Sequence, residues 1–435
     1  MDNLAVTQEV KPPNTKKGPV KWLIDNLFNT WYNTILTCFA LVFLFFVFKG
    51  VFTWVFTQAN WRVIPANIQI LMTGPYPIEQ IWQVWIVLCT LSVLLGLSAG
   101  IWHGLVFKLS IAIASIGLIF LLIPLEIVNF IASIGPTFLF TPLELINKKI
   151  ETEPGTLELN LNFISLIFFK RRWLLGCLVL LVVTFFLGRD KHVLKRWVIG
   201  GWFLSFPWTM IMLHGFGENP VSTTDWGGLL LTLILATVGI VACFPLGVLL
   251  ALGRRSQLPA IKWVSTTYIE TIRGVPLITI LFMGSLILPI FMPGDFQLDK
   301  VIRAMIGLTL FSAAYMAENV RGGLQAVPQG QVEAAQAVGL TYPKTMLFIV
   351  LPQALRSVIP AIVGQFIALF KDTSLVSIVG LLDLFGIARS ILGNPKWQGN
   401  FVEIYLFVAA IYFVFCYAMS YFSQEIEADL GVGKY

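Results

Sequence analysis

The stretch GGLLLTLILATVGIVACFPLGVLLAL occupies residues 227–252 and contains no charged side chain. A helix of about 20 apolar residues is long enough to cross the hydrocarbon layer of a membrane. Similar runs recur along the chain, and hydrophobic residues make up 57% of its 435 residues against 12% charged residues. Soluble domains average about 45–50% apolar and about 25% charged residues. The sequence therefore predicts an all-α, polytopic membrane protein and excludes a water-soluble fold.

We expect about ten transmembrane helices, over residues 33–56, 80–101, 109–130, 173–188, 197–214, 227–252, 275–293, 302–320, 358–381 and 401–423. Short loops rich in Lys and Arg stay in the cytoplasm, so they orient the chain. Basic clusters within residues 11–21, 189–196 and 254–262 all fall inside if there are ten spans. Both termini are then cytoplasmic. Segment 131–172 is the exception, because this threading places it outside although it carries five basic residues.

The chain divides near residue 220. A cytosolic tail at 1–31 precedes a membrane region of about five spans at 32–215, whose loops suggest no chemistry. Residues 226–424 hold five more spans with denser Gly, Pro and small polar residues, and a cytosolic tail follows at 425–435. Helices lined by small residues pack closely and can slide on one another. We therefore interpret the second half as the moving part and the first half as a scaffold.

The stretch RGGLQAVPQGQVEAAQAVGLTYPKTMLFIVLPQALRS, from Arg321 to Ser357, is a long cytoplasmic connection between two spans. Residues 331–338 are predicted to form a short helix that ends at Gly339, because glycine commonly terminates helices. A second helix is predicted from Pro343 to Leu351, where Pro352 should break it. The first helix has a small, barely charged surface, and such a surface lets another protein approach its backbone closely.

This spacing of residues resembles the EAA loop of ABC importer permeases. The residues that match are Glu333, Ala334, Ala335, Gly339, Leu351 and Pro352. In that family the loop docks into the ATPase, so the resemblance implies that Glu333 to Gly339 form a coupling helix. It also implies a type I ABC importer transmembrane core in the second half. Residues 321–357 are called the coupling loop below.

The resemblance further implies partners. The sequence lacks a G-x-x-x-x-G-K-[ST] loop for nucleotide phosphates, so we expect no cofactor in this chain and no ATP hydrolysis by it. ATP and Mg would be bound by a separate ABC ATPase dimer. An extracytoplasmic amino-acid-binding protein and a second permease subunit, expected to be a paralogue, would complete the assembly in the bacterial inner membrane.

Three further segments resemble the polar amino acid uptake branch (HisM/GlnP-like) of these permeases. They are YIETIRGVPLITILF (Tyr268 to Phe282), AENVRGGLQAVPQGQ (Ala317 to Gln331) and LFKDTSLVSIVG (Leu369 to Gly380). The segment ANWRVIPANIQILMTGPYP (Ala59 to Pro77) resembles the long permeases of the general L-amino acid type (AapM or NatC/NatD-like). The resemblance implies an L-amino acid as substrate.

Ionisable residues at membrane depth are candidates for the substrate pathway, because they are expensive to bury. The candidates are Glu318, Lys371, Asp372, Thr373 and Ser374. The run from Lys371 to Ser374 could interrupt its helix and present backbone groups to a ligand. Alternatively, Lys371 and Asp372 neutralise partners on neighbouring helices, and Glu318 pairs with Arg321 one turn away.

Other classes of function find less support. An ion-gradient-driven secondary amino acid transporter is the main alternative, but the sequence lacks the inverted repeat and the deep acidic residues that it predicts. A non-transporting membrane scaffold would not need polar groups at membrane depth. No nucleophile–base group or Cys/His metal pattern is visible, which argues against an enzyme and against a metal site. Basic residues here orient the chain in lipid, and nucleic acid is not expected as a partner.

Overall fold

The computed structural model describes residues 23, 26–122, 172–189, 191–215, 220–291 and 298–431. Most of the expected N-terminal tail, nearly all of segment 131–172 and the last four residues lie outside these ranges. The described residues form helices and connecting turns, together with one isolated bridge between Gly228 and Asp383. This agrees with the predicted all-α class.

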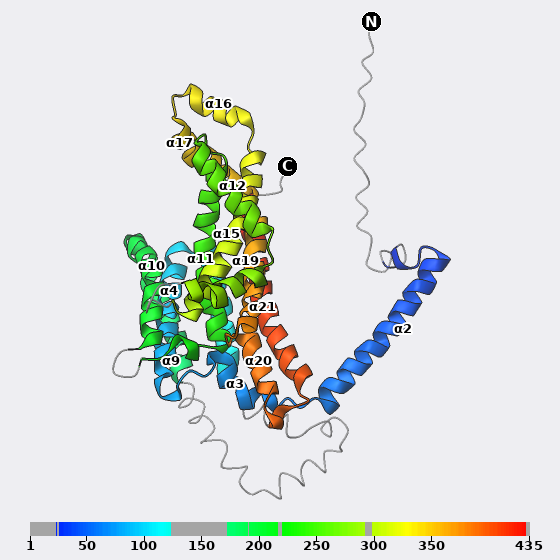
Figure 1. Cartoon of the computed structure of the whole chain (residues 1–435). Helices are drawn as coiled ribbons and strands as arrows, with labels where there is room; N and C mark the ends of the chain where they lie inside the picture. Colours follow the sequence, from blue (N-terminus) through cyan, green and yellow to red (C-terminus); the bar gives the residue numbers. More distant parts are fainter. Residues whose placement is uncertain are drawn as a thin grey trace, which may run out of the picture. The chain divides into compact units, whose positions relative to one another are not determined.

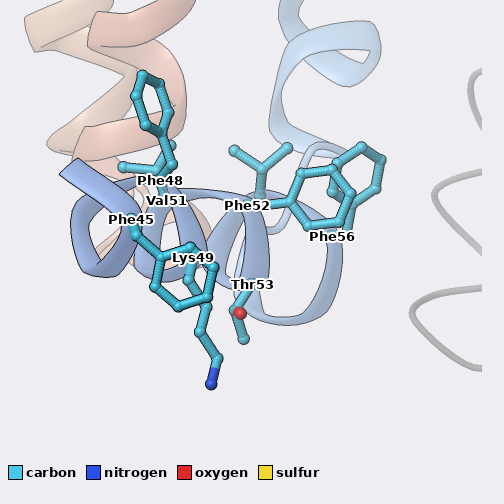
Figure 2. Close-up of a pocket in the computed structure, with 8 residues that line it drawn as sticks. Phe45, Phe48, Lys49, Val51, Phe52, Thr53 and Phe56 are labelled. Atoms are coloured by element: carbon cyan, nitrogen blue, oxygen red, sulfur yellow. The ribbon is translucent and has the colours of Figure 1, made fainter. Parts of the chain in front are cut away.

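The chain forms two compact units, of which the first comprises residues 1–59 and 134–142. Its described part is α2 (Trp31–Thr53), which continues into the π-helical turn η1 (Trp54–Gln58). Apolar side chains surround this helix on all sides and none is buried within the chain. Figure 2 shows a hollow formed only by α2 and η1, in which the Lys49 amine points away from Phe48, Phe52 and Phe56. The hollow therefore offers a phenylalanine-rich surface with a single charge.

The second unit comprises residues 60–133 and 143–435. Its first part contains the helices α3 (Val63–Thr73), α4 (Trp82–Trp102), α5 (Gly104–Leu122), α9 (Arg172–Gly188) and α10 (Lys195–His214). The remaining helices of its membrane part are α11 (Gly228–Arg254), α12 (Pro259–Arg273), α13 (Leu277–Phe282), η6 (Met283–Ile287), α14 (Leu288–Phe291), α15 (Lys300–Ala326), α19 (Ile359–Asp372), η8 (Thr373–Val379), α20 (Leu384–Leu392) and α21 (Phe401–Leu430). Short 3-10 turns connect some of them, at η2 (Ile78–Gln80), η4 (His192–Leu194), η5 (Thr223–Asp225) and η9 (Pro395–Trp397).

Six helical segments of the described chain are long and apolar enough to cross a membrane, and a bent pair raises the number to seven. The bent pair joins α12 to α13–α14 at an angle of 105°. Each of the ten expected spans overlaps a helix within the described residues, but α5, α9 and α10 are not among the six. The described apolar part of α9 is 17 residues long, and α10 contains Pro207 and several polar residues. The number of ten spans therefore stays a prediction. At the C-terminus, α21 continues to Leu430, beyond the expected boundary at residue 424.

Two helices of the first half, α4 and α9, pack together without space between their backbones. A Cβ atom at Gly96 would lie 2.1 Å from Thr184 Oγ1, and one at Gly100 would lie 2.4 Å from the Phe185 carbonyl oxygen. The sulfurs of Cys89 and Cys177, one on each helix, are 3.2 Å apart. Cys89 and Gly96 each face a residue 88 positions further along the chain. This constant offset means that α4 and α9 run in the same direction, as in the expected threading.

The helix α3 joins the first half of the chain to the second. Val63 and Leu71 are fully buried and pack in one cluster with residues of α20 and α21, among them Leu384. The backbone amide of Asn60 donates to Glu403 Oε1 of α21 over 2.8 Å. Residues 60–77 are thus part of the core of the second unit and not a peripheral addition.

Candidate functional site

The coupling loop lies at one end of the second unit, where Figure 1 shows α16 and α17 beyond the ends of α12 and α15. It contains α16 (Gln329–Ala337), α17 (Tyr342–Thr345), the π-helical turn η7 (Met346–Val350) and α18 (Leu351–Ser357). Glu333 and Ala334 are exposed, whereas Ala335 is buried. The helix α16 contacts η7, in which Met346 and Val350 are buried. One face of α16 is therefore held by the loop itself, and the other face is free for a partner.

Gly339 ends α16 as the sequence predicts. Its φ angle is +90°, a conformation that side chains with a Cβ rarely adopt. The Gly339 amide donates to the Gln336 carbonyl over 2.9 Å, and the Leu340 amide donates to the Ala335 carbonyl over 3.1 Å. These two bonds form a Schellman motif, which satisfies the last carbonyls of the helix. Gly339 is exposed and has no heavy atom near its missing Cβ, so its backbone angle is what requires glycine.

The prediction that Pro352 breaks the second helix is wrong. The chain stays helical from Tyr342 to Ser357, and Pro352 lies in the first turn of α18. The preceding turn, η7, is π-helical, and the Leu351 amide donates to the carbonyl of Met346 five residues earlier. Such a wide turn changes the hydrogen-bonding register where proline has no amide hydrogen to donate. The helix therefore passes through Leu351 and Pro352 without ending.

At the root of the loop, α15 and α18 are in backbone contact. A Cβ atom at Gly323 would lie 2.4 Å from the Ala354 carbonyl oxygen, and Ala354 is fully buried. Arg255, just after α11, donates to the Leu324 carbonyl over 2.9 Å. The base of the coupling loop is thus fixed to the membrane helices.

Glu318 of α15 lies in a cluster of charged side chains next to this root. Arg321 Nε donates to Glu318 Oε1 over 2.8 Å, and an Arg321 Nη2 contact to the same oxygen adds a second bond. Arg254 and Arg273 approach the other carboxylate oxygen at 3.4 Å and 3.5 Å. Arg254 also pairs with Glu270 at 2.8 Å. We call Glu318, Glu270, Arg254, Arg273 and Arg321 the Glu318 cluster.

The Arg321 pairing is the alternative that the sequence offered for Glu318. Contact of Glu318 with substrate stays a prediction. Sequence reasoning missed Arg254 and Arg273 as partners of Glu318, and Glu270 as the second partner of Arg254. One feature of the sequence could have indicated these contacts. The basic residues Arg254, Arg273 and Arg321 each lie at or near the end of a helix.

The other substrate-pathway candidates follow one another along the chain. Lys371 is exposed and Asp372 is half-buried at the end of α19, where the helix changes to the 3-10 helix η8. Thr373 is fully buried and donates to the Phe370 carbonyl over 2.7 Å, and the Ser374 carbonyl accepts from Ser377 Oγ over 2.8 Å. The run alters the helix type without breaking the helix. Within the described part of the chain, neither Lys371 nor Asp372 forms a salt bridge.

The described residues contain no group of three or more His, Cys, Asp or Glu side chains that could hold a metal ion. Five cysteines are free thiols. The site consists of the exposed short helix α16, a closely packed root at Gly323 and the Glu318 cluster, which joins three helices. Such an arrangement is suited to transmitting movement from one helix to another.

Comparison with known proteins shows which protein family this chain resembles. Residues 243–428 match the family described as "Binding-protein-dependent transport system inner membrane component". The chain is 50% identical over 239 residues to the inner membrane amino-acid ABC transporter permease protein YhdY of Escherichia coli (strain K12), covering 54% of this chain and 65% of that relative. It is 34% identical over 448 residues to the glutamate/glutamine/aspartate/asparagine transport system permease protein BztC of Rhodobacter capsulatus, covering 96% of this chain and 95% of BztC.

Among solved structures, a crystal structure of an amino acid ABC transporter with histidines matches with 33% identity and a TM-score of 0.42, covering 46% of this chain and 92% of that chain. The match to BztC spans both halves of the chain, including the segment that forms α3. The chain therefore belongs to the permease subunits of polar amino acid ABC transporters (the HisM/GlnP family), close to the long YhdY- and BztC-type members.

Proposed function

We propose that this chain forms part of the pathway for an L-amino acid and drives its opening through α16, which docks into an ABC ATPase dimer. ATP and Mg would be bound by the ATPase. A second permease subunit, a paralogue of this chain, and an extracytoplasmic amino-acid-binding protein would complete the transporter. The single observation that carries the proposal is the geometry of α16, an exposed helix with small side chains, closed by Gly339 and fixed at its base by Gly323.

Physical reasons favour this docking mode. Small side chains at Ala334 and Ala337 let a partner groove approach the helix backbone, which a helix with long side chains would prevent. Glu333 is exposed and offers one charge for orientation. Because the root at Gly323 leaves no space for movement, a displacement of α16 would be transmitted to α15. An ion-gradient-driven transporter would not need an exposed docking helix fixed to its membrane helices. Membership of an ABC transporter family excludes this alternative.

The substrate class rests on the relatives. BztC is named as a transport system permease for glutamate, glutamine, aspartate and asparagine, and YhdY as an amino-acid permease. We propose a polar L-amino acid as the substrate here, with Lys371, Asp372, Thr373 and Ser374 as the residues to examine first for contact with it. A zwitterion needs partners of both signs in a membrane, and Lys371 and Asp372 supply both within one helical turn.

The test is uptake of a mixture of labelled L-amino acids by cells that express this chain with its transport partners. Gly339→Asp should abolish uptake, because aspartate is strained at φ +90° and distorts the end of α16. Gly104→Asp is the matched control, since Gly104 also has a positive φ of 54° and no neighbour near its missing Cβ. Gly104→Asp should leave uptake within about twofold of wild type.

The two possible results for Gly339→Asp lead to different conclusions. If Gly339→Asp protein reaches the membrane at wild-type levels and uptake is lost, the proposed docking helix stands, and the lost labels identify the substrates. Undiminished uptake with Gly339→Asp would show that α16 does not couple the chain to its ATPase.

A further inference from the structure

The Glu318 cluster connects three helices at one carboxylate. Arg254 is the last residue of α11, Arg273 is the last residue of α12, and Arg321 lies in α15 with Glu318. These side chains are between 23% and 34% exposed, so they are largely shielded from solvent. The Arg273 guanidinium also lies 5.7 Å from the centre of the Tyr315 ring. Glu318 thus holds the ends of two helices against a third.

The cluster lies on the route from the coupling loop into the membrane. From Arg321, α15 continues for only five residues to Ala326, and α16 begins at Gln329. The contact between Gly323 and Ala354 fixes this end of α15 to α18. A displacement of α16 along α15 therefore reaches Leu324, which Arg255 contacts, and then Arg321 and Glu318.

Beyond the cluster, α12 leads toward the substrate-pathway candidates. After Arg273 the chain bends by 105° into α13, whose Leu277 and Leu281 are buried. The helix α13 contacts η8, the 3-10 helix that directly follows Lys371 and Asp372. A contiguous path therefore runs from α16 through Glu318 and Arg273 to η8.

We propose that Glu318 is a positioning residue that transmits the displacement of the coupling loop to α11 and α12. The inference rests on the proposed docking of α16 to an ATPase, and it adds which residue carries the movement onward. The carboxylate is suited to this task because it is the shared partner of three arginines. Without the Glu318 charge, Arg273 and Arg321 would lose their ion pair, Arg254 would keep only Glu270, and like charges so close together repel one another.

A contiguous path alone does not establish coupling, so the test must measure coupling. The assembled transporter, with its ATPase, partner permease and binding protein, is reconstituted in proteoliposomes. Uptake of labelled amino acid and hydrolysis of ATP are measured in the same sample for wild type, Glu318→Gln and Glu270→Gln. The side chain of Glu270 is 56% exposed and pairs only with Arg254 among the described residues, so Glu270→Gln is the matched control.

We expect Glu318→Gln to lower the amount of amino acid taken up per ATP at least tenfold, while the ATPase still co-purifies and hydrolyses ATP. Glu270→Gln should change this ratio less than twofold, and Glu318→Asp, which keeps the charge on a shorter side chain, should fall between wild type and Glu318→Gln. A purely structural role would lower uptake and hydrolysis together and leave their ratio unchanged.

Two outcomes would overturn the inference. One is a ratio within twofold of wild type for Glu318→Gln. The other is loss of the ATPase from the purified Glu318→Gln complex, since Glu318 would then act in docking and not in transmission. Failure of the underlying docking proposal would appear separately, as normal uptake by Gly339→Asp. Should Glu318→Gln fail to fold and insert into the membrane, the double variant Glu318→Asp/Arg273→Gln decides, because a ratio within twofold of wild type for it would also contradict transmission.

Discussion

The α4–α9 pair and the root of the coupling loop both bring helix backbones together through a glycine, yet they differ in what surrounds the contact. Around Gly96 and Gly100 the nearest atoms are the Thr184 hydroxyl oxygen and backbone atoms of the facing helix and of the residue that follows it. Around Gly323 the contact with Ala354 lies beside Glu318 and its arginines. Close packing of small residues holds membrane helices together by van der Waals contact. Charged groups at the membrane edge add a force that responds to small changes in distance.

The difference suggests a division of work within the chain. The α4–α9 pair has the features of a permanent contact, with parallel helices and a constant register. The loop root has the features of a contact that transmits movement, because close backbone packing lies next to a group of charged side chains. Changes in the first region should alter how much folded protein there is, and changes in the second should alter how fast the protein works.

The largest effect is expected at Gly323. Gly323→Ala places a Cβ 2.4 Å from the Ala354 carbonyl oxygen, so α15 and α18 must separate. Overpacking of this kind costs about 1–3 kcal/mol, and the shift tilts the coupling loop. We expect uptake per molecule of permease to fall at least tenfold. The neighbouring Gly322→Ala meets no atom within 4 Å and should keep wild-type uptake. Equal uptake by Gly323→Ala and Gly322→Ala would show that close packing at the loop root does not control the rate of transport.

A smaller and different effect is expected at Gly96. Gly96→Ala brings a Cβ within 2.1 Å of Thr184 Oγ1 and 2.4 Å of the Leu181 carbonyl oxygen. The purified protein should melt several degrees lower and accumulate less in the membrane, with uptake per molecule within about twofold of wild type. Gly176→Ala on α9 meets no atom within 4 Å and serves as the control. A large loss of uptake per molecule would contradict the division between the two regions.

The sequence predicts one of these regions far better than the other. The helix α16 could be located because its signals are local, with Gly339 as a turn residue and Glu333 to Ala335 as a motif. The continuous helix through Pro352 was not predicted, because the π-helical turn that accommodates the proline has no recognisable sequence pattern. The joining of Glu318 to Arg321 was offered as an alternative, since the two residues are one turn apart.

Contacts between distant parts of the chain were mostly beyond reach. Arg254 and Glu318 are 64 residues apart, and no periodicity in the sequence connects them. The α4–α9 pair had a usable signal in Gly96 and Gly100, which form the small-xxx-small spacing typical of close helix packing. That spacing indicates that a partner helix exists but does not identify it. The burial of α3 in the core likewise depends on α20 and α21, more than 300 residues away along the chain.

The smallest effect, and the sharpest test of a static first half, is expected from joining α4 to α9 covalently. Cys89 and Cys177 are free thiols with their sulfurs 3.2 Å apart. Oxygen with a copper–phenanthroline catalyst should convert them to a disulfide, removing two protons and two electrons. The linked tryptic peptides would be detected by mass spectrometry. Because the register between these helices is fixed by Gly96 and Gly100, uptake by the cross-linked protein should stay within about twofold of the untreated protein.

The control for this experiment is Cys177→Ser, which cannot form the link but keeps Cys38, Cys243 and Cys416 for any other oxidation. If the cross-linked protein loses uptake while oxidised Cys177→Ser retains it, α4 and α9 must move against each other during transport. The first half would then take part in the transport cycle, and its glycines would be sliding contacts like those that membrane helices use when they rock. Retained uptake would instead place the movement outside the α4–α9 contact, and the region joined by Glu318 is then the candidate, because it combines close backbone contact with charges from three helices.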